Sequence, residues 1–149
     1  MHRTIRVQAA IVRHHELLLI QHREHRTDRA YWLLPGGGME ADETEVGCLA
    51  REVQEETGVA VAVGPLLCRE PTPPGDVYHT FNTYLCTPIN GAARPGIEPE
   101  DDIAAVYAIT AVQWIDLRDD TKWATDVRGD SRTYPLLKRV QAILGYAPT

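Results

Sequence analysis

The chain has 149 residues, of which 44% are hydrophobic and 24% are charged, and its formal net charge is −6. This length suits one compact domain, so residues 1–149 are predicted to fold as a single unit. The acidic balance argues against a protein that coats DNA or RNA, although a small phosphorylated ligand can still bind through a metal ion.

Cysteine usage and hydropathy indicate the compartment. Cys48, Cys68 and Cys86 form neither a CxxC pair nor a zinc-ligand pattern with the six histidines, so we expect reduced thiols. Residues 1–11 lack the continuous apolar run of a signal peptide, and no apolar run in this sequence is long enough to span a membrane. A cytoplasmic protein without a membrane partner is therefore expected.

The first third of the chain has the two-residue period of strands. Within residues 4–12, Ile5, Val7, Ala9 and Ile11 recur at every second position, and the mostly apolar residues 17–21 follow a polar turn, which predicts a hairpin. Residues 22–29 are interpreted as a loop, and residues 31–34 as a short strand. The segment 35–38, Pro-Gly-Gly-Gly, is predicted to be a turn that can approach a ligand closely.

The period then changes to that of a helix over residues 45–57. Thr44 or Asp42 can cap its start, and Gly58 stands where a left-handed residue would end it. The predicted buried stripe consists of Val46, Leu49, Ala50 and Val53.

The second half is predicted to alternate strands and loops. Strands are expected over residues 59–67, 77–86 and 112–117, with a proline-rich loop at 71–75 and a further loop at 90–102. Residues 119–131 are expected to be irregular. Thr133 can cap a last helix, which Gly145 stops. Its expected buried residues are Leu136, Leu137, Val140, Ile143 and Leu144.

Three glutamates on the predicted helix 45–57 carry the chemistry. Glu52 has Glu55 and Glu56 three and four residues further on, where side chains are neighbours and like charges repel. A hard divalent cation would relieve that repulsion, because Mg²⁺ prefers carboxylate, water and phosphate oxygens. Taken alone, the cluster is more typical of a solvated acidic helix face.

The surrounding spacing decides between these two interpretations. From Gly37 the chain continues with five residues, Glu43, seven residues, Arg-Glu-Val at 51–53, one residue, Glu-Glu at 55–56, one residue, and Gly-Val at 58–59. Residues 37–59 thus resemble the signature of the Nudix hydrolase superfamily at every fixed position. The run 31–38, Tyr-Trp-Leu-Leu-Pro-Gly-Gly-Gly, and the segment 114–117, Trp-Ile-Asp-Leu, are also similar to this family.

The resemblance implies an α/β fold of the α+β type, in which a mixed, curved sheet lies between helices. It implies Mg²⁺, with Mn²⁺ as a substitute, held by Glu52, Glu55 and Glu56 and by a backbone carbonyl at Gly36. The catalytic set is expected to be Glu52, Glu55 and Arg51, the arginine orienting a glutamate of the cluster. The expected structural residues of the box are Gly37, Glu43 and Gly58.

The general base is the least defined part of the site. A box glutamate serves in some relatives, and a distal loop supplies the base in others. In this chain the distal candidates are Glu98, Glu100 and Asp101, for which an ordinary solvated acidic loop is the competing interpretation.

Substrate recognition is predicted from weaker patterns. Pro73 and Pro74, fifteen and sixteen residues past Gly58, resemble the pattern of ADP-ribose pyrophosphatases. Arginines of the loop 22–29 can bind phosphate, and aromatic residues of the strand 77–86 can stack on a base. The candidates are Arg23, Arg26 and Arg29, and Tyr78, His79 and Phe81.

The expected activity is hydrolysis of a phosphoanhydride bond in a nucleoside diphosphate derivative, with ADP-ribose favoured. Alternatives are a pyrophosphohydrolase of (deoxy)nucleoside triphosphates, including oxidised ones, and a non-catalytic nucleotide sensor. The expected partner is a nucleotide-derived small molecule and not a nucleic acid. Many relatives are dimers, so a homodimer is an alternative to a monomer, and the sequence identifies no interface.

Overall fold

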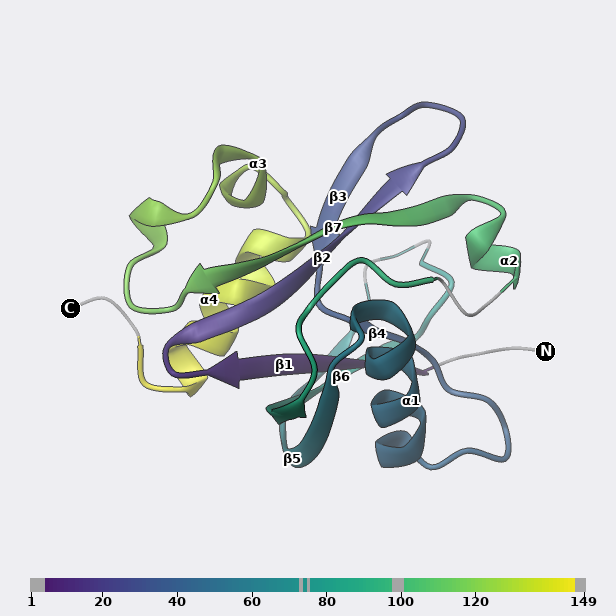
Figure 1. Cartoon of the computed structure of the whole chain (residues 1–149), viewed down its shortest axis with the longest axis horizontal. Helices are drawn as coiled ribbons and strands as arrows, with labels where there is room; N and C mark the ends of the chain where they lie inside the picture. Colours follow the sequence, from purple (N-terminus) through teal and green to yellow (C-terminus); the bar gives the residue numbers. More distant parts are fainter. Residues whose placement is uncertain (1–4, 73, 75, 98–100, 147–149) are drawn as a thin grey trace.

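The computed structural model describes residues 5–72, 74, 76–97 and 101–146 (Figure 1). The strands are β1 (Ile5–Arg13), β2 (Glu16–Glu24), β3 (Ala30–Leu33), β4 (Gly36–Gly38), β5 (Ala60–Pro71), β6 (Thr80–Asn90) and β7 (Tyr107–Asp116). The helices are α1 (Glu45–Thr57), α2 (Asp101–Ala104), η1 (Asp120–Lys122), α3 (Thr125–Arg128) and α4 (Thr133–Ile143).

The strands form a mixed sheet in the order β3-β2-β1-β6-β5, with β7 on β2 and β4 on β1. The predicted hairpin is confirmed, because β1 and β2 are antiparallel through Val12–Leu17 and Arg13–Glu16. Strand β6 runs parallel to β1, which no hairpin could achieve, and α1 and β5 lie between them in the chain. The α+β class with a mixed, curved sheet is therefore confirmed.

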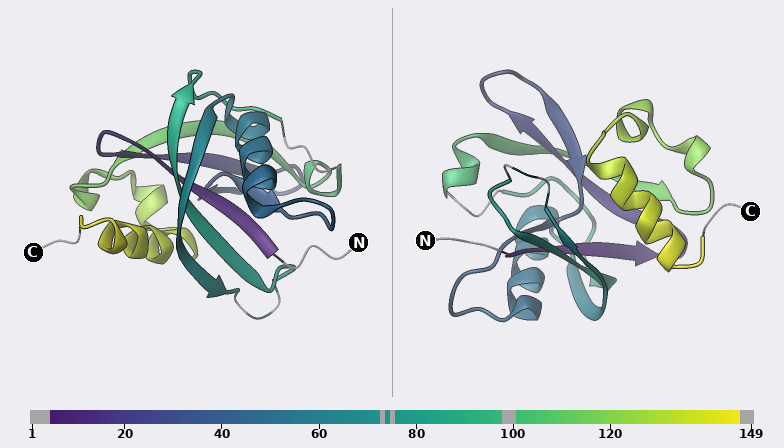
Figure 2. Two further views of the ribbon diagram at one scale, coloured as in Figure 1. Left: turned by 90° about the horizontal axis from the view of Figure 1, so that it is seen from below. Right: turned by 180° about the vertical axis from the view of Figure 1, so that it is seen from behind.

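The alternation of side chains on β1 and β2 creates two cores on opposite faces of the strands. Residues Val7, Ala9 and Ile11 of β1 pack in a cluster with Leu49 and Val53 of α1. Ala10 instead belongs to a cluster that includes Leu137 and Val140 of α4. Figure 2 accordingly shows α1 and α4 on different sides of these strands. Even-numbered positions of β1 thus face away from α1.

Both ends of α1 have the predicted caps. The hydroxyl of Thr44 accepts a hydrogen bond from the Gly47 N–H at 3.0 Å, so Thr44 rather than Asp42 is the cap residue. Gly58 has φ +74°, the left-handed conformation that glycine adopts without a steric penalty. At the start of the helix, Asn82 and Tyr84 of β6 donate to the Glu45 carboxylate at 2.7 and 2.8 Å, which anchors α1 to the sheet.

Several sequence expectations were wrong in detail. The three glycines predicted as a turn form β4, which hydrogen-bonds to β1 with Gly37 opposite Val7. Residues 22–24 continue β2, and residues 119–131 contain η1 and α3 instead of irregular chain. Val46 and Ile143, predicted to be buried, are 50% and 48% exposed because each lies at the edge of its helix's apolar stripe. No helix in the described part of the chain is long and apolar enough to cross a membrane.

Candidate active site

The helix α1 lies beside β4 (Figure 1). Its Glu52 and Glu56 are one helical turn apart, and both are fully buried. The backbone N–H of Gly36 donates to Oε1 of Glu56 at 2.8 Å. A Cβ atom at Gly37 would lie only 2.5–2.7 Å from the carboxylate atoms of Glu52. A side chain at position 37 would therefore displace the Glu52 carboxylate.

Arg51 connects the glutamates of this helix to the loop before it. Its Nη2 and Nε donate to Oε2 of Glu43 at 2.8 and 3.1 Å, and its Nη1 lies 3.4 Å from Oε2 of Glu55 and 3.5 Å from Oε1 of Glu52. Burial alone would lower the pKa of Arg51, but the bonds to Glu43 and the surrounding negative charges outweigh it and raise that pKa. One guanidinium thus contacts three carboxylates, a suitable position for orienting Glu52 or Glu55.

Glu43 is held on both of its carboxylate oxygens. Oε2 accepts from Arg51, and Oε1 accepts from the Glu40 N–H at 3.1 Å. Burial would raise the pKa of Glu43, but these hydrogen bonds prevail and lower it below the usual carboxyl range. The carboxylate therefore connects the loop 39–44 to α1, and the structural role expected for Glu43 stays a prediction.

The donor atoms at this site fit a divalent cation. Glu52 and Glu56 place hard oxygen ligands one helical turn apart. The strand β4 passes close to the Glu52 carboxylate, because Gly37 has no side chain there. Among the described residues, no three side chains of His, Cys, Asp or Glu are gathered as a ready metal site, since the 38% exposed Glu55 lies beside Arg51. Gly36 contributes its N–H to Glu56, and ligation by its carbonyl stays a prediction.

A segment after β6 covers the last turn of α1. The N–H groups of Arg94, Gly96 and Ile97 donate to the carbonyls of Thr57, Glu56 and Glu55 at 2.9, 2.8 and 3.1 Å. The distal base candidates follow this segment. Glu98 and Glu100 lie outside the described residues, and Asp101 begins α2, with its side chain not among those described. A role as base stays a prediction for all three.

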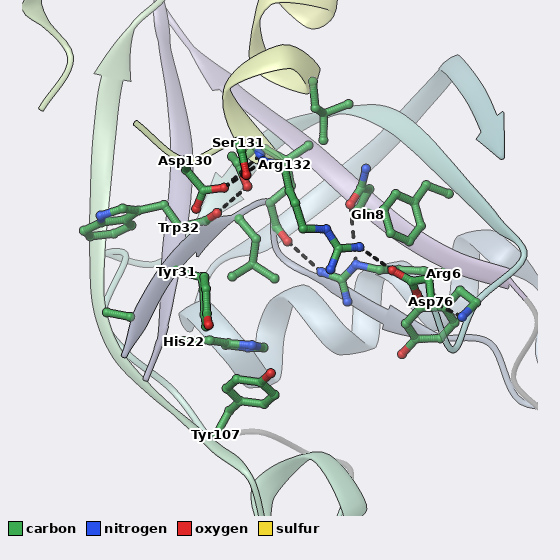
Figure 3. A pocket seen from close by; sticks show the side chains of 18 of the residues that line it. Arg6, Gln8, His22, Tyr31, Trp32, Asp76, Tyr107, Asp130, Ser131 and Arg132 are labelled. Atoms are coloured by element: carbon green, nitrogen blue, oxygen red, sulfur yellow. Dashed lines mark hydrogen bonds and ion pairs between the residues drawn. The ribbon is translucent and has the colours of Figure 1, made fainter. Parts of the chain in front are cut away.

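A cavity of about 720 Å³ opens on the face of β1 that carries α4, and Gly36 lines it (Figure 3). One end has aromatic rings: His22 of β2 stacks on Tyr107 of β7 with ring centroids 5.3 Å apart, and the Tyr31 ring lies edge-on to Tyr107. The other end has the guanidinium groups of Arg6 and Arg132. Gly36 therefore links the glutamates of α1 to a cavity with apolar and cationic walls.

The predicted substrate residues divide into two groups. Tyr78 and Phe81 line the cavity, and so does Arg29. Arg23 and Arg26 do not: Arg23 donates to the Asp28 carbonyl at 2.9 Å, and Arg26 is exposed in the turn after β2.

Other cavity residues were missed from the sequence. Arg6, His22, Tyr107 and Arg132 line the cavity but come from four different segments. The polar pair Arg6 and Gln8 in an otherwise apolar first strand was the one local signal that could have identified this face.

Known proteins share both the sequence pattern and the fold. The NUDIX domain profile matches residues 2–136. A MutT-like protein of Streptomyces ambofaciens is 38% identical over 91 residues, 60% of this chain and 51% of that protein. The human 8-oxo-dGDP phosphatase NUDT18 is 39% identical over 99 residues, 65% of this chain and 29% of that protein. A crystal structure of a MutT NUDIX hydrolase from Burkholderia pseudomallei has TM-score 0.65 and 28% identity, covering 91% of this chain and 96% of that one. The chain thus spans about half or less of the two curated relatives.

Proposed function

Because the chain belongs to the NUDIX domain family, we propose that it hydrolyses a pyrophosphate bond in a nucleoside diphosphate derivative and uses Mg²⁺ to do so. The observation that carries this proposal is the pair of fully buried carboxylates, Glu52 and Glu56, against the glycine strand that borders the cavity. Carboxylate oxygens are the hard ligands that Mg²⁺ prefers, and this pair lies beside the strand that borders the cavity.

The residues of α1 have distinct roles in this proposal. Glu52 and Glu56, with Glu55 and the Gly36 carbonyl, hold the cation, for which Mn²⁺ can substitute. A bound Mg²⁺ neutralises phosphate charge, polarises a phosphoryl oxygen and lowers the pKa of water. Arg51 holds the Glu52 and Glu55 carboxylates in place through the contacts at 3.5 and 3.4 Å.

Proton transfer from the attacking water needs a carboxylate that water can reach. Glu55 is 38% exposed, whereas Glu52 and Glu56 are fully buried, which favours Glu55 within the box. The alternative bases are Glu98, Glu100 and Asp101. The described residues just before them are Gly96 and Ile97, whose N–H groups donate to the carbonyls of Glu56 and Glu55. The chain therefore leads to these candidates from a point beside the glutamates of α1, which supports them as alternative bases.

ADP-ribose is the favoured substrate. The supporting features are the prolines at 73 and 74, the run Trp-Leu-Leu-Pro-Gly-Gly-Gly at 32–38, and a cavity whose aromatic end suits a base. The leading alternative is a (deoxy)nucleoside triphosphate or an oxidised nucleotide, since one relative is an 8-oxo-dGDP phosphatase. A non-catalytic sensor is disfavoured because Glu52, Glu55 and Glu56 are all present. A cytoplasmic location and a homodimer stay predictions from the sequence.

A substrate panel tests the proposal. ADP-ribose, the nucleoside triphosphates and 8-oxo-dGDP are each incubated with Mg²⁺, and the products are separated by chromatography. ADP-ribose should give AMP and ribose 5-phosphate with the highest kcat/KM, a chelator should abolish turnover, and added Mg²⁺ should restore it. A higher kcat/KM for a triphosphate would replace ADP-ribose as the substrate, and full turnover in chelator would refute the metal mechanism.

A further inference from the structure

Arg6 is a buried cation at the floor of the cavity. It is 9% exposed, it lies on β1, and it lines the cavity (Figure 3). Its Nη2 donates to the Leu34 carbonyl at 2.9 Å, and its Nε lies 3.4 Å from Oε1 of Gln8. Among the described residues, Arg6 forms no ion pair, although a guanidinium is always charged and usually has an acidic partner when buried.

The acidic groups of the cavity are engaged elsewhere. Asp76 forms an ion pair with Arg132. Asp126 accepts from the indole N–H of Trp32 at 2.8 Å, and Asp130 accepts from the backbone N–H of Thr133 at 3.0 Å. Within the described part of the chain, the three carboxylates that line the cavity therefore form no hydrogen bond or ion pair with Arg6 and are held by other groups.

The guanidinium is also held in a defined direction. The Leu34 carbonyl fixes one of its nitrogen atoms, and Gln8 approaches another while its own amide donates to the Thr83 hydroxyl at 2.9 Å. Nη1 makes no hydrogen bond to a described residue. A rotamer-rich side chain that is fixed in advance loses little entropy on binding, so this geometry favours recognition of an anion.

The position of Arg6 relative to α1 limits what it can bind. Val7, its neighbour on β1, packs with α1, so Arg6 faces the other side of the strand. Arg6 contacts the Leu34 carbonyl, and Gly36, two residues further on, donates to Glu56. Two residues of extended chain span about 6.6 Å. The guanidinium thus lies on the opposite face of β1 from the helix that carries Glu52 and Glu56.

We propose that Arg6 binds a phosphate of the substrate that lies on the cavity side of the bond to be cleaved. This inference rests on the proposed hydrolysis and specifies its substrate: the part that enters the cavity ends in a phosphate after cleavage. Arg6 therefore contributes to binding whichever nucleotide is used, and it retains a phosphomonoester product independently of the metal. Arg132 is a weaker second donor, because Asp76 already occupies it.

Binding of products in chelator tests this assignment without relying on activity. Calorimetry compares AMP, GMP and ribose 5-phosphate with adenosine, guanosine and ribose, using the full chain without metal. We expect at least one phosphorylated compound to bind at least tenfold more tightly than its counterpart. The substitution Arg6→Gln should reduce that preference about 10–100-fold, the range for a lost charge-assisted hydrogen bond. Arg6→Lys keeps the positive charge but loses the planar set of guanidinium donors, so it should reduce the phosphate preference less.

A matched control lies on the same strand. Arg13 pairs with Glu16 and stacks on Trp114 outside the cavity, so Arg13→Gln should keep the preference for phosphate. Thermal unfolding shows whether each variant folds. If Arg6→Gln does not fold, the test uses the phosphate preference of Arg6→Lys instead. An absence of phosphate preference in the wild type, or its full retention in the folded Arg6 variant, would overturn the inference. Either result would leave Mg²⁺-dependent hydrolysis, measured separately, unaffected.

Discussion

The two sides of the glycine strand β4 are built in opposite ways. On the α1 side, Glu43, Arg51, Glu52 and Glu56 come from one stretch of chain, and acidic groups outnumber the single arginine among them. On the cavity side, side chains from β1, β2, β3, β7 and the segments around α3 meet, and the most buried cation among the described ones is Arg6. An acidic cluster suits a cation, whereas a buried guanidinium suits a phosphate. The comparison suggests that β4 separates catalysis from substrate recognition.

The largest expected effect comes from Glu52→Gln on the α1 side. The substitution keeps the size and helix propensity of the residue but removes a charge that the metal needs. We expect kcat to fall roughly 10²–10⁴-fold, the range for catalytic acid–base groups, with the KM for substrate changed much less. Steady-state kinetics at saturating Mg²⁺ measures both constants. Near-normal kcat would mean that Glu52 is not a metal ligand.

Gly37→Ala should have the next largest effect, because the new methyl group must displace the Glu52 carboxylate. Overpacking of this kind costs about 1–3 kcal/mol in the free energy of unfolding. We also expect weaker Mn²⁺ binding, since a ligand has been moved. Chemical denaturation and calorimetric Mn²⁺ titration measure the two effects. Wild-type stability and metal affinity in this variant would show that α1 and β4 are not as close as described.

Glu43→Gln should mainly affect stability. The charge lies near the start of α1 and bonds to a half-exposed Arg51, so its loss should cost about 1 kcal/mol at neutral pH. The pKa of Glu43 is lowered in the folded chain. Its contribution to stability is therefore complete above the ordinary carboxyl pKa of about 4.3 and is lost as the pH falls through the lowered value.

Urea unfolding of wild type and Glu43→Gln at neutral pH and at a pH of about 3 tests that sign. The difference in unfolding free energy between the two proteins should shrink at the lower pH. A difference that grew on acidification would contradict the pairing of Glu43 with Arg51. Loss of kcat as large as that of Glu52→Gln would contradict the structural role assigned to Glu43.

The smallest expected effect belongs to the cavity side and has the opposite direction. Asp76→Asn removes the carboxylate beside Arg132 and makes the cavity more positive. The Arg132 side chain is 61% exposed, so solvent screens its charge and phosphomonoester binding should tighten by a few-fold at most. Calorimetry with AMP in chelator measures it. Weaker binding in this variant would indicate that Asp76 contacts the ligand directly.

The α1 side could be predicted from the sequence because its geometry is local. Residues three and four apart are neighbours on any helix, so the meeting of Glu52 with Glu56 follows from spacing alone. The Thr44 cap and the left-handed Gly58 follow from equally local rules. The strand β4 could not be predicted, since three glycines have no side-chain alternation and their pairing with β1 is a long-range contact.

The cavity side could not be assembled from local rules. Alternation on β1 indicates that Arg6 and Gln8 share a face, but not that β7 and the segment before α4 complete a cavity there. Arg23 and Arg26 are near the glycine strand in sequence, but Arg23 donates to the Asp28 carbonyl and Arg26 is exposed in the turn after β2. Which residues line a cavity depends on tertiary packing among distant segments.

The division of labour across β4 is tested most directly by Mn²⁺ titration calorimetry without nucleotide on the wild type, Glu52→Gln and Arg6→Gln. Mn²⁺ affinity should fall at least tenfold in Glu52→Gln, because a charged oxygen ligand is lost, and should be unchanged in Arg6→Gln, whose charge lies on the other side of the strand. Equal weakening in both variants, or in neither, would contradict the separation of a metal side from a phosphate-binding side.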